Sequence, residues 1–156
     1  MITIAAETDK AQITDITARA GVFGQAEVDA IPVMFDEYLQ YGAGDDGYKF
    51  IVYRNEDQVL GYACYGIRDL ADGVYDLFFI AVDPEARQRG IGRALITAAE
   101  DAVRAMRGRI LIAETSGTAE YESTRKFYVS MGYVNEASIK DFYKPGDDLK
   151  IFTKKI

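Results

Sequence analysis

Histidine and tryptophan are absent from this chain of 156 residues, and cysteine occurs once, at Cys64. Without histidine the chain cannot build a Ser-His-Asp or Cys-His nucleophile system, nor an imidazole metal site. A single cysteine excludes an intrachain disulfide and a thiolate metal cluster. Acid–base chemistry must therefore use carboxylates, tyrosine, lysine, Cys64, the termini or water, and we expect no metal cofactor.

Long apolar runs are also missing. No run approaches the ~20 residues that cross a bilayer, and the first residues lack the basic region and apolar stretch of a signal peptide. We therefore expect a cytoplasmic protein without membrane contacts. Basic residues are the minority, since 18 Lys and Arg stand against 25 Asp and Glu, for a net charge of −7. Such acidity argues against nucleic-acid partners and favours cationic ones such as amines, although it serves equally well to keep a protein soluble.

The length and a hydrophobic content of 49% suit one domain over residues 1–156. Strand patterns are expected at residues 1–6, 48–53, 59–67, 74–82, 110–113, 133–143 and 149–154, and helical patterns at 8–19, 25–41, 91–106 and 121–131. The strand, helix and strand between residues 74 and 113 predict a right-handed parallel crossover. The fold class is therefore α/β (α+β), with a mixed sheet and helices on both faces.

A glycine-rich turn precedes the third helix and reads Arg87-Gln-Arg-Gly-Ile-Gly-Arg93. Free amides at a helix start, glycines that leave room for approach and nearby positive charge are what a pyrophosphate needs. The plainer interpretation is a turn with solvated arginines, and for Arg89 the two interpretations are even. A dinucleotide fingerprint is disfavoured because Leu95 occupies its third glycine position.

This turn also carries a resemblance to a known family. Arg87 to Gly92 resembles the Arg/Gln-x-x-Gly-x-Gly/Ala signature of the GNAT superfamily of acetyl-CoA-dependent N-acetyltransferases. Phe127-Tyr128-Val-Ser-Met-Gly-Tyr133 resembles the family's downstream motif, and the run from Glu114 to Asp148 is similar to a bacterial-type subgroup whose acceptor the sequence does not specify. The resemblance extends over essentially the whole chain.

The resemblance implies a mostly antiparallel central sheet in which one parallel strand pair splays apart. The acyl-carrying arm of acetyl-CoA would lie in a gap between residues 78–82 and 110–115, held by the backbone of Ile80 and Val82. The family pattern assigns the pyrophosphate to the amides of Gln88, Arg89, Gly90, Ile91, Gly92 and Arg93, with Arg87 at the family's basic or amide position. The family often has Asn and Ala where this chain has Tyr121 and Thr124, so Ser123 or Thr124 is expected to replace the Asn contact with the arm.

Chemistry on an amine requires a base, because a lysine-like amine is mostly protonated at pH 7. Asp76 occupies the strand position where histone-acetylating members of the family carry a glutamate base, and strand alternation predicts one shared face for Asp76, Phe78, Ile80 and Val82. Glu114, at the end of the next strand, is the competing base. The alternatives are a solvated strand start for Asp76 and a cap or ion pair for Glu114.

Tyr128 matches the family's general acid, and the alternative is a helix tyrosine packed in the core. The Ile80 N–H would polarise the thioester carbonyl. The leading hypothesis is acetyl transfer from acetyl-CoA to a primary amine, most plausibly of a small molecule, by direct attack in a ternary complex. The rivals are a protein or peptide N-acetyltransferase and a non-catalytic CoA-binding regulatory domain. A homodimer is expected by family analogy only.

Overall fold

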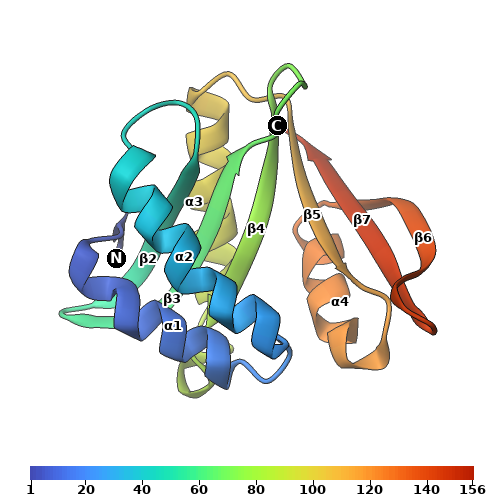
Figure 1. Cartoon of the computed structure of the whole chain (residues 1–156), viewed down its shortest axis with the longest axis horizontal. Coiled ribbons are helices and arrows are strands. Elements are labelled where there is room, and N and C mark those ends of the chain that lie inside the picture. The colour runs from blue at the N-terminus through green and yellow to red at the C-terminus, as the bar shows by residue number, and fades with distance from the viewer.

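The computed structural model describes all residues from Met1 to Ile156. A seven-stranded sheet has the order β1-β2-β3-β4-β5-β7-β6, in which only β4 and β5 are parallel (Figure 1). The strands are β1 (Ile2–Ile4), β2 (Tyr48–Asn55), β3 (Gln58–Ile67), β4 (Val74–Val82), β5 (Ile110–Ser116), β6 (Val134–Lys144) and β7 (Asp147–Lys155). The predicted mixed, mostly antiparallel sheet with one parallel pair is confirmed.

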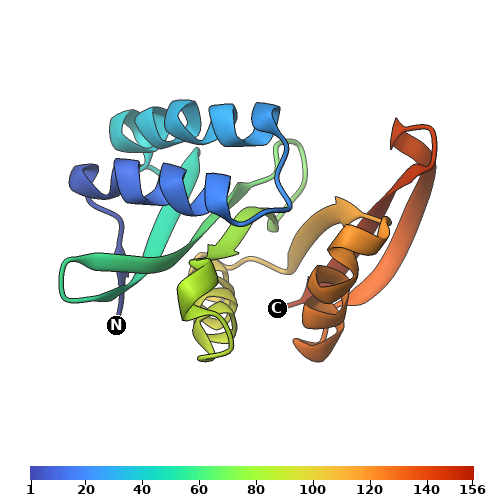
Figure 2. The ribbon, with the colours of Figure 1, turned by 90° about the horizontal axis from the view of Figure 1, so that it is seen from below.

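Four helices cover the sheet, together with short 3-10 segments at Glu7–Asp9, Pro84–Ala86 and Ala119–Tyr121. They are α1 (Lys10–Arg19), α2 (Gln25–Tyr41), α3 (Ile91–Ala105) and α4 (Glu122–Ser130). Helices α1 and α2 lie on one face of the sheet, and α3 and α4 lie on the other (Figure 2). None of the four is long and apolar enough to cross a membrane.

Each face of the sheet has its own core. The expected apolar stripe of α3 is buried at Ile91, Leu95, Ala99 and Val103, in a cluster that includes Leu111 of β5. The second cluster lies under α1 and α2 and contains Ile13, Ile16, Ile31, Phe35, Phe50 and Tyr62. These two closely packed cores hold the sheet firmly between its helices.

The parallel pair separates halfway along its length. Residues Val74–Leu77 pair with Ile110–Ala113, and beyond these residues β4 and β5 diverge (Figure 1). The expected splay is therefore present, but the gap is shorter than predicted. Ile110–Ala113 lie in the paired part, and β5 borders the gap only from Glu114 onward.

A β-bulge in β4 overturns the predicted side-chain alternation. Cys64 pairs with Phe79 while Tyr65 pairs with Leu77, so Phe78 is an extra residue that has no partner on β3. An extra residue reverses the faces of all residues that follow it. Ile80 and Val82 consequently pack on the α3 side, whereas Asp76 shares the α1–α2 face with Phe79. The predicted common face for Asp76, Ile80 and Val82 is wrong.

Candidate functional site

The turn between β4 and α3 presents free main-chain donors. Gln88 and Gly90 have positive φ values of 64° and 76°, and α3 begins at Ile91, directly after Gly90. No group of the chain accepts a hydrogen bond from the main-chain amides of Gln88 to Arg93. Such a fan of free N–H groups at the positive end of a helix dipole suits an anion.

The arginines of this turn have different surroundings. The Arg87 guanidinium donates to the Ala20 carbonyl at the end of α1, at 2.8 Å, so it anchors the turn to a neighbouring helix. Arg89 reaches only the Glu85 carbonyl, at 3.3 Å. Arg93 is exposed and makes no hydrogen bond or ion pair within the chain. Arg93 is therefore the least engaged of the three, Arg89 is weakly held, and the predicted ligand contact of Arg87 stays a prediction.

Gly92 lies where the start of α3 approaches α4 and β4. A Cβ atom added at Gly92 would lie 3.6 Å from the Phe127 ring of α4 and 3.8 Å from Val82 of β4, which are ordinary contact distances. The glycine leaves the neighbouring main-chain amides uncovered by a side chain of its own.

Tyr128 has a fixed ring and an unused hydroxyl. The ring packs against Phe127, Tyr133 and Phe152, with centroid separations of 5.7, 5.6 and 5.7 Å. The residue is 5% exposed, and its hydroxyl has no hydrogen-bond partner in the chain. Burial raises the pKa of Tyr128, so the phenol stays protonated and can act as a donor.

Arg68, which follows β3, joins the two candidate bases. Its guanidinium makes three hydrogen bonds of 2.7–3.0 Å to the Asp76 carboxylate and one of 3.3 Å to Glu114. These contacts raise the pKa of Arg68, the bonds to Asp76 most of all. The Asp76 side chain is 11% exposed and the Glu114 side chain 41%. The Asp76 carboxylate is therefore mostly buried and paired with a partly exposed Arg68, whereas Glu114 remains accessible.

Sequence reasoning missed Arg68. The signal that could have found it is the hairpin around residues 69–73, which places Asp76 opposite Gly66 and Arg68 opposite Val74, so that Arg68 and Asp76 are diagonal neighbours on one face. That inference needs the register, which the sequence alone does not give.

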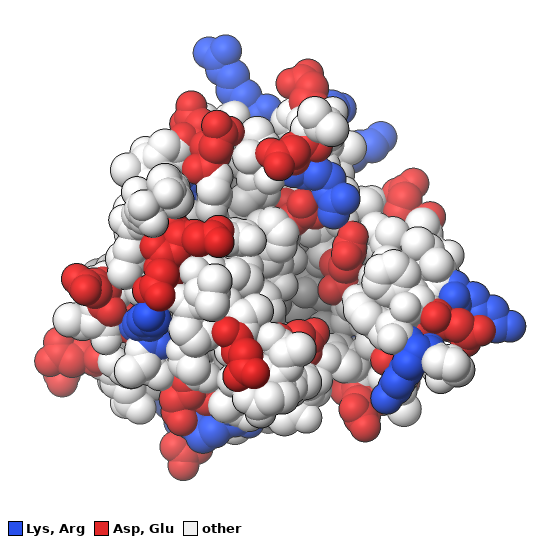
Figure 3. Space-filling view, viewed as in Figure 1, with Lys and Arg blue, Asp and Glu red and all other residues white.

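Two tyrosines and three carboxylates surround the opening of the gap on the α2 side. Burial raises the pKa of Tyr143, and the negative charges of Glu114, Glu27 and Asp147 raise it further. Burial, with the charges of Glu27 and Asp147, also raises the pKa of Tyr121 to about 12. Figure 3 shows a hollow between the part of the molecule that contains β1–β4 and the part that contains β5–β7, with acidic side chains at its edge. This negative charge favours a cationic ligand.

Tyr121 spans this opening. Its hydroxyl donates to the Val22 carbonyl in the α1–α2 connection, at 2.5 Å. Ser123 is exposed and Thr124 is half-buried, and neither side chain has a hydrogen-bond partner. Their predicted contact with the ligand arm stays a prediction.

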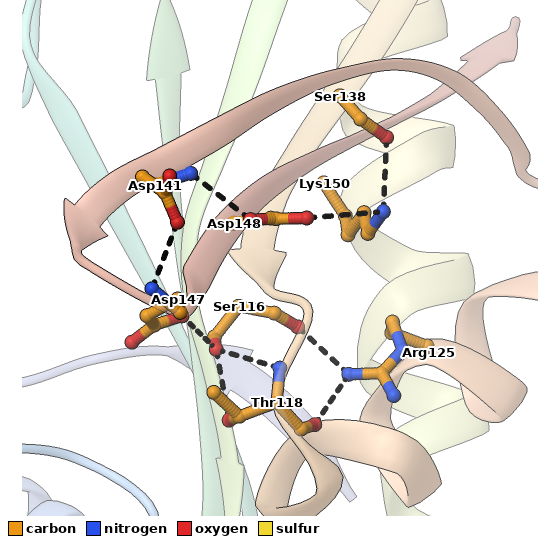
Figure 4. Close-up of polar contacts among 9 residues, drawn as sticks. Ser116, Thr118, Arg125, Ser138, Asp141, Asp147, Asp148 and Lys150 are labelled. Carbon is orange, nitrogen blue, oxygen red and sulfur yellow. Dashed lines mark hydrogen bonds and ion pairs between the residues drawn. The ribbon is translucent and has the colours of Figure 1, made fainter.

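A polar network fixes the end of β5 to its neighbours (Figure 4). The Ser116 hydroxyl donates to the Asp147 carboxylate at the start of β7. The Arg125 guanidinium donates to the carbonyls of Ser116 and Thr118, at 2.8 and 2.7 Å. These bonds tie α4 and the β6–β7 turn to the β5 end that borders the gap.

The polar groups at this site fit coenzyme A. The free amides at the start of α3 match a diphosphate, and β4 and β5 diverge beyond Leu77 and Ala113, which leaves room for an extended ligand arm.

Comparison with known proteins also indicates an acetyltransferase. The family model described as Acetyltransferase (GNAT) family matches residues 13–133. A solved structure from Desulfovibrio desulfuricans, described as an acetyltransferase of the GNAT family, has 36% identity and a TM-score of 0.95, with 99% of this chain and 98% of that chain covered. An acetyltransferase structure from Salmonella typhimurium, determined with its cofactor acetyl-CoA, has 20% identity and a TM-score of 0.77, with 99% and 92% covered.

One curated relative also matches. It is a mycothiol acetyltransferase from Rhodococcus opacus, 35% identical over 91 residues. The match covers 56% of this chain and only 28% of that protein, so the relative is much longer than the region the two share.

Proposed function

The chain belongs to the acetyltransferase (GNAT) family and is an acyltransferase, and on that premise we propose that it transfers an acetyl group from acetyl-CoA to a primary amine of a small molecule. The reaction is a direct attack in a ternary complex. The nitrogen–carbon bond forms as the carbon–sulfur bond of the thioester breaks. A protonated amine loses two protons in all, one before it attacks and one as the amide forms; one proton passes to the base and on to solvent, and the other reaches the thiolate of coenzyme A.

The observation that carries this proposal is the row of unpartnered amides from Gln88 to Arg93 beside an opened sheet. The amides hold the diphosphate, with Arg89 and Arg93 adding positive charge. The free edge of β4 at Ile80 and Val82 holds the pantetheine arm, and the Ile80 N–H polarises the thioester carbonyl. Acetyl-CoA, when bound, supplies the activated acyl group.

Glu114 is the better proton acceptor of the two carboxylates. Both oxygens of Asp76 accept hydrogen bonds from Arg68, and protonation would weaken that charged pair. Glu114 has one weak contact to Arg68 at 3.3 Å and an exposed side chain, so it can receive the amine proton through a water molecule. Asp76 then serves to hold Arg68 in place.

Tyr128 faces the leaving group. Its protonated hydroxyl has no competing partner, and its ring is clamped by three aromatic neighbours. A fixed donor of this kind stabilises charge as it develops on the sulfur. The acidic opening formed by Glu27, Glu114 and Asp147 favours the approach of a protonated amine.

The test combines binding and turnover. Titration calorimetry with acetyl-CoA should give binding in the micromolar range, and a panel of small amines and of peptides with free N-termini should reveal acceptors by release of free CoA. Absence of binding at millimolar acetyl-CoA would overturn the proposal. Binding without CoA release for any acceptor would instead support a regulatory domain, and release with peptides alone would support a protein acetyltransferase.

A further inference from the structure

Phe78 is an exposed aromatic residue in the middle of the sheet. It belongs to β4, an inner strand, and is 40% exposed. Every other exposed large apolar residue lies at the N-terminus, on an edge strand, in a helix or in the β3–β4 turn. Single exposed apolar residues are common on protein surfaces, but an inner strand between two layers of helices normally buries such side chains. The exposure of Phe78 therefore requires an explanation.

The divergence of the parallel strands explains this exposure. Pairing of β4 with β5 ends at Leu77 and Ala113, so the next residue on each strand, Phe78 or Glu114, borders the gap. Phe78 contacts Tyr48, which packs against the cluster under α1 and α2. Ala113 is buried on the opposite face, and alternation places Glu114 on the α1–α2 face. The ring and the carboxylate thus lie at the same end of the gap, one on each strand.

The ring of Phe78 is fixed by its neighbours on one side. It packs edge to face against the Tyr48 ring, with 5.2 Å between the two centroids. Gly66 of β3 leaves the space that the ring occupies, because an added Cβ atom would lie 3.2 Å from it. The remaining surface of the ring is exposed beside the opening. A ligand that covers a fixed ring does not have to order it first, which favours binding.

A carboxylate and an apolar ring at one opening favour a ligand with both kinds of group. Glu114 attracts a protonated amine, and so do Glu27 and Asp147, which like Glu114 lie near Tyr143. A polar chain placed against the Phe78 ring would lose its hydration without gaining a hydrogen bond. An apolar chain instead gains free energy when it covers the ring.

We propose that the acceptor is a primary amine whose amino group is carried by an apolar chain or ring, and that Phe78 selects it. The amino group lies beside Glu114, and the carbon atoms next to it pack on the ring of Phe78. This inference rests on the proposed function. It adds the class of acceptor and a residue that determines specificity.

The test compares hexylamine with 2-(2-aminoethoxy)ethanol, a chain of equal length in which oxygen atoms replace two of the carbon atoms. In steady-state kinetics, kcat/KM of the wild type should be about tenfold or more higher for hexylamine. In Phe78→Ala this preference should fall to about twofold or less, mainly through a higher KM for hexylamine. The Kd for acetyl-CoA, measured by titration calorimetry, should be the same in both proteins.

A matched pair of variants separates polarity from size. Phe78→Leu keeps an apolar side chain and should keep most of the preference, whereas Phe78→Asn, of similar size but polar, should lose it. This pair also tests the inference if the Ala variant fails to fold. Ile4→Ala is the control, because Ile4 is an exposed apolar residue on β1, at the far edge of the sheet. It should keep the wild-type preference.

A wild type that prefers the ether amine would overturn the inference, as would an equal preference in wild type and Phe78→Ala. Weaker binding of acetyl-CoA by Phe78→Ala would do the same, because the ring would then contact the cofactor rather than the acceptor. Failure of the wild type to bind acetyl-CoA, or to acetylate any small amine, would overturn the proposed function and this inference with it.

Discussion

Arg68 decides which of the two carboxylates is available for chemistry. It binds Asp76 with both carboxylate oxygens and touches Glu114 with one. The sequence analysis placed Asp76 and Glu114 on the correct strands but did not choose between them as the base. The residue that distinguishes them, Arg68, lies near both only because of the hairpin register. The same limit applies to Arg87, whose motif position suggested a ligand contact although its side chain anchors the turn to α1.

The first prediction compares the two carboxylates. Glu114→Gln should lower kcat by about 100-fold, the effect expected for loss of a general base, with little change in the Kd for coenzyme A. Asp76→Asn should mainly lower stability, by about 1–2 kcal/mol, because it weakens a charged hydrogen-bonded pair. Steady-state kinetics and thermal melts separate the two effects. A larger loss of kcat in Asp76→Asn than in Glu114→Gln would reverse the assignment.

The second prediction concerns Tyr128. Tyr128→Phe should lower kcat by about 100-fold while the melting temperature stays the same, since the hydroxyl has no partner in the chain. Burial raises the pKa of Tyr128, so the ratio of wild-type to variant rates should stay constant from pH 7 to about pH 10, where an ordinary tyrosine is half ionised. A ratio that has fallen to about half by pH 10 would show that the phenol titrates in the normal range.

At the scale of elements, two irregularities of β4 and α3 shape the candidate site: the glycine-rich turn and the β-bulge at Phe78. The sequence predicts only the first of them. The glycine-rich turn was predicted, because glycines among arginines at a helix start have a recognisable pattern. The bulge at Phe78 was not, because an unbroken apolar run such as Leu-Phe-Phe-Ile-Ala-Val gives no local mark of an extra residue. It depends on how β3 pairs with β4, which is a tertiary property.

The third prediction separates the two glycines of the turn. Gly92→Ala should fold normally or gain slightly in stability, because the added Cβ meets only ordinary contacts with Phe127 and Val82 and alanine favours helices. It should nevertheless weaken coenzyme A binding about tenfold or more, because a side chain at this position hinders the approach of the diphosphate to the main-chain amides. Gly90→Ala should destabilise the protein by about 1 kcal/mol, because a side chain is disfavoured at φ 76°.

Urea denaturation and calorimetry measure these two quantities for each variant. Equal coenzyme A affinity in Gly92→Ala and wild type would mean that the diphosphate does not approach the chain at Gly92.

At the scale of the whole molecule, the order of strands and helices followed from apolar periodicity, turn residues and the family motif. What the sequence could not give is how the parts are tied together. Arg19 of α1 binds Asp83, the first residue after β4, with separations of 3.1 and 2.8 Å. Tyr121 reaches across the opening to Val22. Both connections join residues that are far apart in the chain and carry no local signature.

The fourth prediction follows from the Arg19–Asp83 pair. The hydrogen bonds from Arg19 hold the pKa of Asp83 below its ordinary value. A carboxylate with a lowered native pKa stabilises the fold fully above its unfolded pKa of about 4, and this contribution is lost as the pH falls through the native value. Thermal melts from pH 3 to 6 should therefore show a weaker acid dependence for Asp83→Asn than for wild type.

Asp15→Asn is the matched control, since Asp15 also binds Arg19 but is exposed. Its acid dependence should equal that of the wild type, and an equal slope in Asp83→Asn would show that the buried pair is not responsible.

The divergence of β4 and β5 has one more consequence, for the handling of the protein. It leaves two unpaired strand edges in the middle of the sheet, and unpaired edges can pair with strands of other molecules. A coenzyme arm lying between them would work as a substitute strand that shields both edges. Preparations without bound coenzyme should therefore aggregate on storage, and added coenzyme should reduce this aggregation.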